Sequence, residues 1–133
     1  MSLARAGLFG LVALLLAAPA ALARDSGEDE YMQACAACHG ETGIGDGPLA
    51  GLINIDVPDL TQLSAQNGGS FPMQRVIQII DGRTGLRGHG SPMPVWGDRF
   101  TAEALPEAGA YGAELVVRGR ILSIAYFLES IQK

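Results

Sequence analysis

The chain has 133 residues, with nine Lys or Arg against fourteen Asp or Glu and a formal net charge of -5. This length leaves room for one small domain. The sequence contains no basic or aromatic-rich stretch of the kind that binds nucleic acid, so we expect no such partner. An acidic chain instead favours electrostatic steering toward a partner with a basic docking face.

The first 23 residues have the form of a secretory signal peptide. Arg5 supplies a positive charge, an apolar run follows, and small residues suited to signal peptidase end at Ala23. A retained membrane anchor is the alternative, but spanning needs about 20 apolar residues, and Pro19 breaks the run. We therefore expect residues 1–23 to be cleaved, and residues 24–133 to form one periplasmic domain.

A helix is predicted to begin at Ser26. This residue can cap the first turn, and the three acidic residues at 28–30 interact favourably with the positive helix end. Tyr31 follows on this helix, one turn before Cys35 and on the same face. Gly27, one turn before Tyr31, either lets another helix cross closely or is merely a permissive turn residue.

The sequence Cys35-Ala36-Ala37-Cys38-His39 is a c-type haem attachment motif. The thiols of Cys35 and Cys38 can add to the two haem vinyl groups, and His39 can bind the iron as the proximal ligand. A thioredoxin-like redox pair is one alternative, but it needs a βαβ pattern that the sequence lacks. A zinc site is another, although its fourth ligand would be the distant His89, which has no paired-ligand spacing.

A glycine-rich loop, residues 40–48, follows His39. It lacks the Gly-Lys-Ser/Thr ending of a phosphate-binding loop. Its glycines would allow the chain to pass close to a flat cofactor. Pro48 stiffens the exit of the loop, and its carbonyl is predicted to hold the His39 imidazole N–H. Simple stiffening of the loop is the alternative role for Pro48.

Two helices are predicted next. A short one begins at Pro58-Asp59 and ends at Asn67-Gly68-Gly69. The second begins at Ser70-Phe71-Pro72 and ends at Asp81-Gly82. Its apolar residues follow the spacing of one buried face: Met73, Val76, Ile77 and Ile80.

Pro92 and Pro94 flank Met93 and force an extended strap. Such a strap could present the Met93 thioether to the far side of the iron, where His/Met ligation raises the haem potential. His89 in the same strap is the rival ligand, but its glycine neighbours would hold it less firmly. Trp96 and Phe100 could cover the cofactor, although Trp96 could also be an ordinary packed aromatic residue.

The longest helical pattern runs from about Ala113 to Ile131. It is predicted to cross the helix of Tyr31, with Gly119 allowing a close approach. Its predicted inner face includes Leu115, Leu122, Ala125, Tyr126 and Glu129, flanked by Ile121, Ile124 and Phe127.

Four features make the chain resemble a monohaem class I cytochrome c: the haem motif, the Gly45-Asp46-Gly47-Pro48 loop, Met93-Pro94 and the terminal helix. The resemblance implies an all-α fold with about four short helices and loops wrapped round one covalently bound haem c. It also implies axial ligation by His39 and Met93. The stretch between Phe100 and Ala113 is longer than in compact members, and the sequence gives no function for it.

Three functions remain open at this point. The leading one is a periplasmic one-electron carrier that meets other redox proteins, because two axial protein ligands leave no site for a substrate. The second is a haem c subunit of a larger periplasmic dehydrogenase or oxidase complex. The third is a haem protein with an open sixth position, which would bind carbon monoxide. Membrane contact is expected only through the signal segment, if it is retained.

Overall fold

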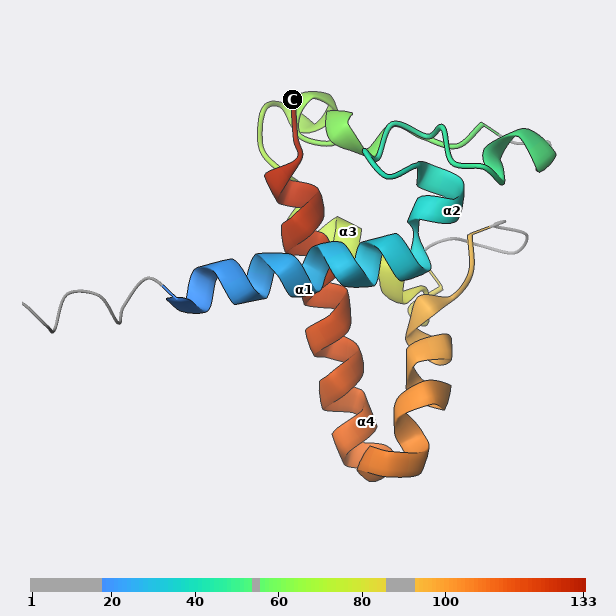
Figure 1. Ribbon diagram of the computed structural model, residues 1–133, viewed down its shortest axis with the longest axis vertical. Coiled ribbons are helices and arrows are strands. Elements are labelled where there is room, and N and C mark those ends of the chain that lie inside the picture. Colours follow the sequence, from blue (N-terminus) through green and yellow to red (C-terminus); the bar gives the residue numbers. More distant parts are fainter. Residues whose placement is uncertain (1–17, 54–55, 86–92) are drawn as a thin grey trace, which may run out of the picture.

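The computed structural model describes residues 18–53, 56–85 and 93–133, with side chains from Ser26 onward. These ranges contain four α-helices: α1 (Ala18–Ala34), α2 (Ala36–His39), α3 (Met73–Asp81) and α4 (Trp96–Ser130). The described residues between α2 and α3 form three 3-10 helices: η1 (Ala50–Leu52), η2 (Leu60–Gln62) and η3 (Ala65–Asn67). These ranges contain no strand, which confirms the all-α fold class. Figure 1 shows the arrangement.

Two sequence predictions fall largely outside the described residues. Most of the predicted signal segment and the whole of the glycine-flanked His89 region lie there. Among the helices that the structure does describe, none combines the length and apolar character needed to cross a membrane.

Helix α1 begins at Ala18 and runs without interruption past Ser26, so the predicted helix start at Ser26 is wrong for the full chain. The residues just before Ser26 are mostly alanine and leucine, which favour helix strongly. They carry the helix upstream, and Ser26 therefore lies inside it rather than at its cap.

The predicted crossing between α1 and the last helix is confirmed (Figure 1). A Cβ atom at Gly27 would collide with the backbone carbonyl of Ser123 on α4. Four residues further along α1, the fully buried Tyr31 packs against Phe127, with ring centroids 4.9 Å apart. Gly27 is therefore the residue that permits the close approach.

Helix α4 is a helical hairpin, because Gly109 within it has non-helical backbone angles of φ 65° and ψ 175°. Only glycine adopts such angles without strain, and Pro106 also lacks the N–H that a continuous helix would need. The stretch between Phe100 and Ala113 therefore forms the outer part of two antiparallel arms, which project from the body of the molecule in Figure 1.

The face of the second arm that is buried differs from the predicted one. Its buried residues are Ala113, Val117, Ile121, Ile124, Ala125 and Leu128. Leu115, Leu122 and Tyr126 are exposed instead, and a Cβ atom at Gly119 would meet nothing within 4 Å. Apolar residues occur all round this arm, so their spacing alone did not define the inner face.

Helix α3 ends at Asp81 as predicted and begins at Met73, directly after the predicted start at Ser70-Phe71-Pro72. Val76 and Ile80 are buried in the core. The end of α3 is capped by Gly82 in the left-handed conformation, as the sequence indicates. The predicted short helix before it is divided into η2 and η3, and the Asp59 carboxylate caps η2 by accepting the Thr61 N–H at 2.8 Å.

Candidate haem-attachment site

The haem motif forms a single helical turn, α2, which follows α1 after a bend at Cys35. Cys35 is buried and Cys38 is partly buried, and neither is in a disulfide. Burial raises the pKa of the Cys35 thiol to about 12, and the neighbouring Cys38 adds to the shift. The backbone N–H groups of Cys38 and His39 both donate to the Cys35 carbonyl, at 3.1 and 3.0 Å, so the three residues share one helical turn.

The glycine-rich loop folds back onto α2 and caps its carbonyl end. Three consecutive carbonyls, of Ala37, Cys38 and His39, accept backbone N–H groups at 2.8, 3.2 and 2.8 Å from Leu49, Gly47 and Gly45. The last carbonyls of a helix have no partner inside the helix, so this loop supplies them. The motif is therefore held in a fixed shape by the residues that follow it.

The close fit explains why this loop needs glycine. A Cβ atom at Gly47 would lie 2.6 Å from the carbonyl oxygens of Ala36 and Ala37. The prediction that the loop must have little side-chain bulk is correct, but in the structure the nearby group is the backbone of α2.

Tyr31 fixes the start of the same loop. Its hydroxyl donates a hydrogen bond to the Gly40 carbonyl at 2.6 Å, and both groups are buried. Burial raises the pKa of Tyr31 well above the usual phenol value, so the hydroxyl remains a donor. The helix crossing and the haem turn are thereby joined through one side chain.

His39 is buried, and its Nδ1 lies 3.4 Å from the carbonyl oxygen of Pro58. Burial lowers the pKa of His39, while the Pro58 contact opposes that shift. A neutral imidazole is the form that binds iron. The predicted partner, the Pro48 carbonyl, is therefore wrong: Pro58 occupies that position. In the sequence, Pro58 indicates only the start of a helix.

The other ring nitrogen of His39, Nε2, has no hydrogen-bond partner among the described residues. An unpartnered polar atom on a buried side chain calls for an explanation, and an absent ligand is one. Two thiols one helical turn apart and an available imidazole nitrogen are the groups that haem c requires. The residues present therefore fit this cofactor, whose iron supplies a one-electron redox couple.

Met93 and Trp96 lie on the same side-chain cluster as Cys35. Both are partly buried and pack against the core that also contains Val76, Ile80 and the fully buried Phe100. The Trp96 ring lies 5.4 Å from the Phe100 ring. The structure thus places Met93 and Trp96 against the hydrophobic core that includes Cys35, whereas Pro48 is exposed.

The two alternative readings of the motif can be compared with this geometry. The described ranges contain no strand and hence no βαβ unit around the cysteines. In those same ranges, no three His, Cys, Asp or Glu side chains are grouped as metal ligands would be.

In a comparison with known protein families, the chain matches one family model. The model of the family described as "Cytochrome C oxidase, cbb3-type, subunit III" matches residues 22–111. No curated protein and no solved structure matches the chain. The match confirms the resemblance to monohaem c-type cytochromes and the expectation of a covalently bound haem c with iron.

Proposed function

We propose that this chain, which belongs to the family of cbb3-type cytochrome c oxidase subunit III, is an exported electron-transfer protein. Membership of this family supports the view that the protein transfers electrons through haem c and does not itself catalyse a reaction. In this proposal the protein works in the periplasm, Cys35 and Cys38 carry the haem, and His39 and Met93 bind the iron.

The observation that carries the proposal is the environment of His39. Its Nδ1 lies 3.4 Å from the Pro58 carbonyl oxygen, which leaves Nε2 available to bind an iron ion. A contact of this kind orients a metal-binding imidazole and raises its basicity, which supports His39 as the proximal ligand.

The test is an optical spectrum of the purified, exported protein in both oxidation states. We expect the spectrum of a low-spin c-type haem, and carbon monoxide should leave the reduced spectrum unchanged, because Met93 already fills the sixth position. Rapid binding of carbon monoxide would instead support the ligand-binding alternative. Absence of covalently bound haem would refute the proposal entirely.

The family of this chain also favours a second candidate function, that of a haem-bearing subunit in a larger oxidase complex. In that case the protein should remain with the membrane complex after mild detergent extraction and gel filtration. A free carrier should elute alone at the size of one small domain.

Export and processing form a separate part of the proposal. The apolar segment before Ala23 supports cleavage there, so mass measurement should give a chain that begins at Arg24. A mass that includes residues 1–23, with the protein in the membrane fraction, would show that the segment is an anchor.

A further inference from the structure

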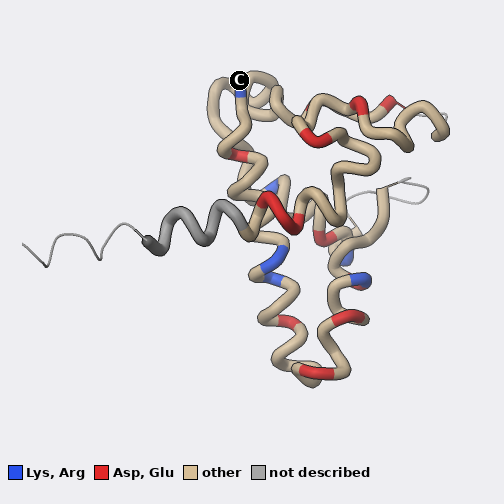
Figure 2. The backbone as a smooth tube through the Cα atoms, viewed as in Figure 1, with Lys and Arg blue, Asp and Glu red and all other residues tan. Residues whose placement is uncertain are grey.

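Charge is distributed very unevenly along the chain. Residues 25–74 contain eight Asp or Glu and no Lys or Arg, whereas residues 75–133 contain seven Lys or Arg and six Asp or Glu. Figure 2 shows the result: the loop after α2 carries red residues, and neither α2 nor this loop carries a blue one. The part of the molecule that holds the haem motif is therefore the acidic part.

A surface hollow of about 560 Å³ lies directly against this motif. Its lining includes Ala36 and Ala37, the two residues between the haem-bearing cysteines, together with Met32 and Thr42. Because alanine side chains are small, a partner seated in this hollow can approach the haem-bearing turn closely. Electron transfer slows steeply with distance, so a close approach at this point is valuable.

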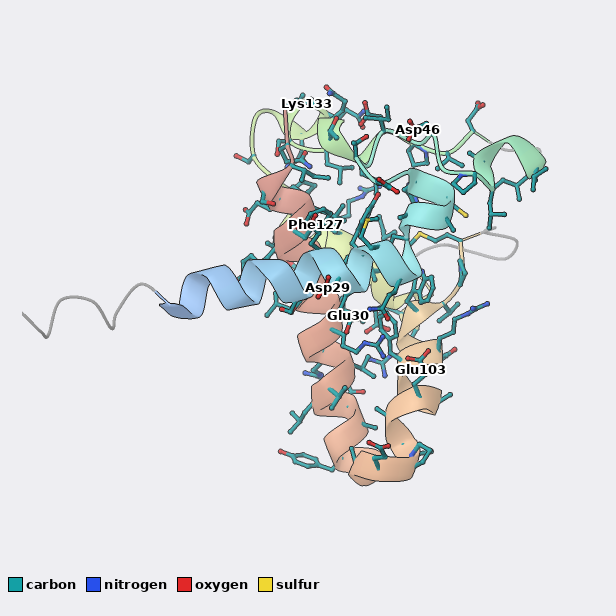
Figure 3. All side chains as sticks on the ribbon, in the orientation of Figure 1. Asp29, Glu30, Asp46, Glu103, Phe127 and Lys133 are labelled. Carbon is teal, nitrogen blue, oxygen red and sulfur yellow. The ribbon has the colours of Figure 1, made fainter. Side chains whose placement is uncertain are left out.

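The carboxylates of Glu41 and Asp46 line the same hollow, and both side chains are exposed. Neither forms an ion pair with any residue that the structure describes. Figure 3 shows Asp46 on the loop above α2, away from the arginine-bearing arms of α4. Their charge is thus available to an external group.

A second hollow, of about 580 Å³, lies between α3 and α4 and makes an informative contrast. Its carboxylates, Asp81 and Glu114, are already paired with Arg83 at 2.6 and 2.8 Å. That hollow offers little uncompensated charge. Size does not distinguish the two hollows, but unpaired negative charge does.

We infer that the hollow over α2 is the docking site of the redox partner, a protein that presents an apolar contact ringed by Lys or Arg. The nearby exposed side chains of Met32 and Leu49, 39% and 44% accessible, supply matching apolar area. The inference rests on the proposed function, because it assigns the surface through which the haem exchanges electrons.

The probe for this surface is tris(phenanthroline)cobalt(III), an apolar trication. One electron passes from the reduced haem to cobalt(III), which leaves cobalt(II) and oxidised haem. Glu41→Lys should slow this reaction about fivefold or more at low ionic strength, with the difference lost at high salt. The anionic oxidant ferricyanide should show the opposite change.

The matched control for charge is Glu107→Lys, which makes the same change at an exposed residue on the α4 hairpin. It should alter both rates much less. Equal effects of Glu41→Lys and Glu107→Lys would mean that only net charge matters and would overturn the inference.

A second pair of variants tests the hollow without changing charge. Thr42→Trp should fill the hollow over α2 and slow oxidation by the cobalt complex about threefold, on the scale of modest steric effects. Thr84→Trp makes the same change in the other hollow and should leave the rate unaltered. Equal rates for the two would also overturn the inference. If the wild-type protein holds no haem, the proposed function itself fails.

Discussion

At the scale of single residues, Met93 is the most informative position. It packs against the same core as Cys35, and the prolines on both sides restrict its backbone. We predict that the oxidised protein shows the weak near-infrared band of iron–thioether bonding. Met93→Ala should abolish that band and His89→Ala should preserve it; the reverse pattern would make His89 the ligand.

Gly27 gives a second prediction at this scale. Gly27→Ala places a methyl group against the Ser123 carbonyl, and such overpacking should lower the free energy of unfolding by about 1–3 kcal/mol. Gly119→Ala is the control, since nothing lies within 4 Å of its Cβ position. It should raise stability by about 0.5–1 kcal/mol, because alanine favours helix. Thermal melts of both variants test this, and a stable Gly27→Ala protein would contradict the crossing.

The residues of the site could be predicted to different degrees. Cys35, Cys38 and His39 are local in sequence, and one helical turn determines how they group. The partner of the His39 ring could not be predicted in this way, because Pro48 and Pro58 both follow the motif closely in the sequence. Only the path of the chain decides that Pro58, 19 residues away, lies at Nδ1, while Pro48 is exposed.

At the scale of elements, α3 was predictable because its spacing, its glycine stop and its buried face all agree. The α4 hairpin was not. Most of its outer residues are exposed and small or apolar, so they show no helical periodicity, and the turn depends on one glycine conformation. The buried face of its second arm also depends on where α1 crosses it. The spacing of apolar residues in the sequence does not specify that crossing point.

Arg120 joins three elements and yields the prediction for this scale. Its guanidinium lies 2.8 Å from Glu30 on α1 and 2.6 Å from Glu103 on the first arm of α4. Figure 3 labels these two carboxylates. The guanidinium also lies 3.8 Å from the centroid of the Phe100 ring. The three partners fix the two arms against α1.

Arg120→Ala should lower the free energy of unfolding by about 2 kcal/mol, since it leaves the partly buried Glu30 unpaired. The control is Arg118→Ala. Arg118 is 74% exposed and contacts only Glu114 among the ion pairs of the described residues, so its loss should cost below about 0.5 kcal/mol. Denaturant titration of both proteins separates the outcomes, and equal values would show that Arg120 does not join the arms.

At the scale of the whole molecule, the haem is expected to complete the core. A domain of this size buries a small core, and a bound cofactor stabilises only the folded state. A Cys35→Ala, Cys38→Ala double variant should therefore lose most helical circular dichroism and its cooperative melt. A fully helical variant with a sharp thermal transition would show that the chain folds without the haem.

The uneven charge has one more consequence. Excess carboxylate at the haem end and near neutrality elsewhere give the molecule a permanent electric dipole. A basic protein at a distance below about one Debye length, roughly 8 Å in physiological salt, would exert a torque on this dipole. The molecule would then turn its haem end forward before any surfaces touch. More collisions would begin in an orientation that allows electron transfer, and fewer would need a rotational search afterwards.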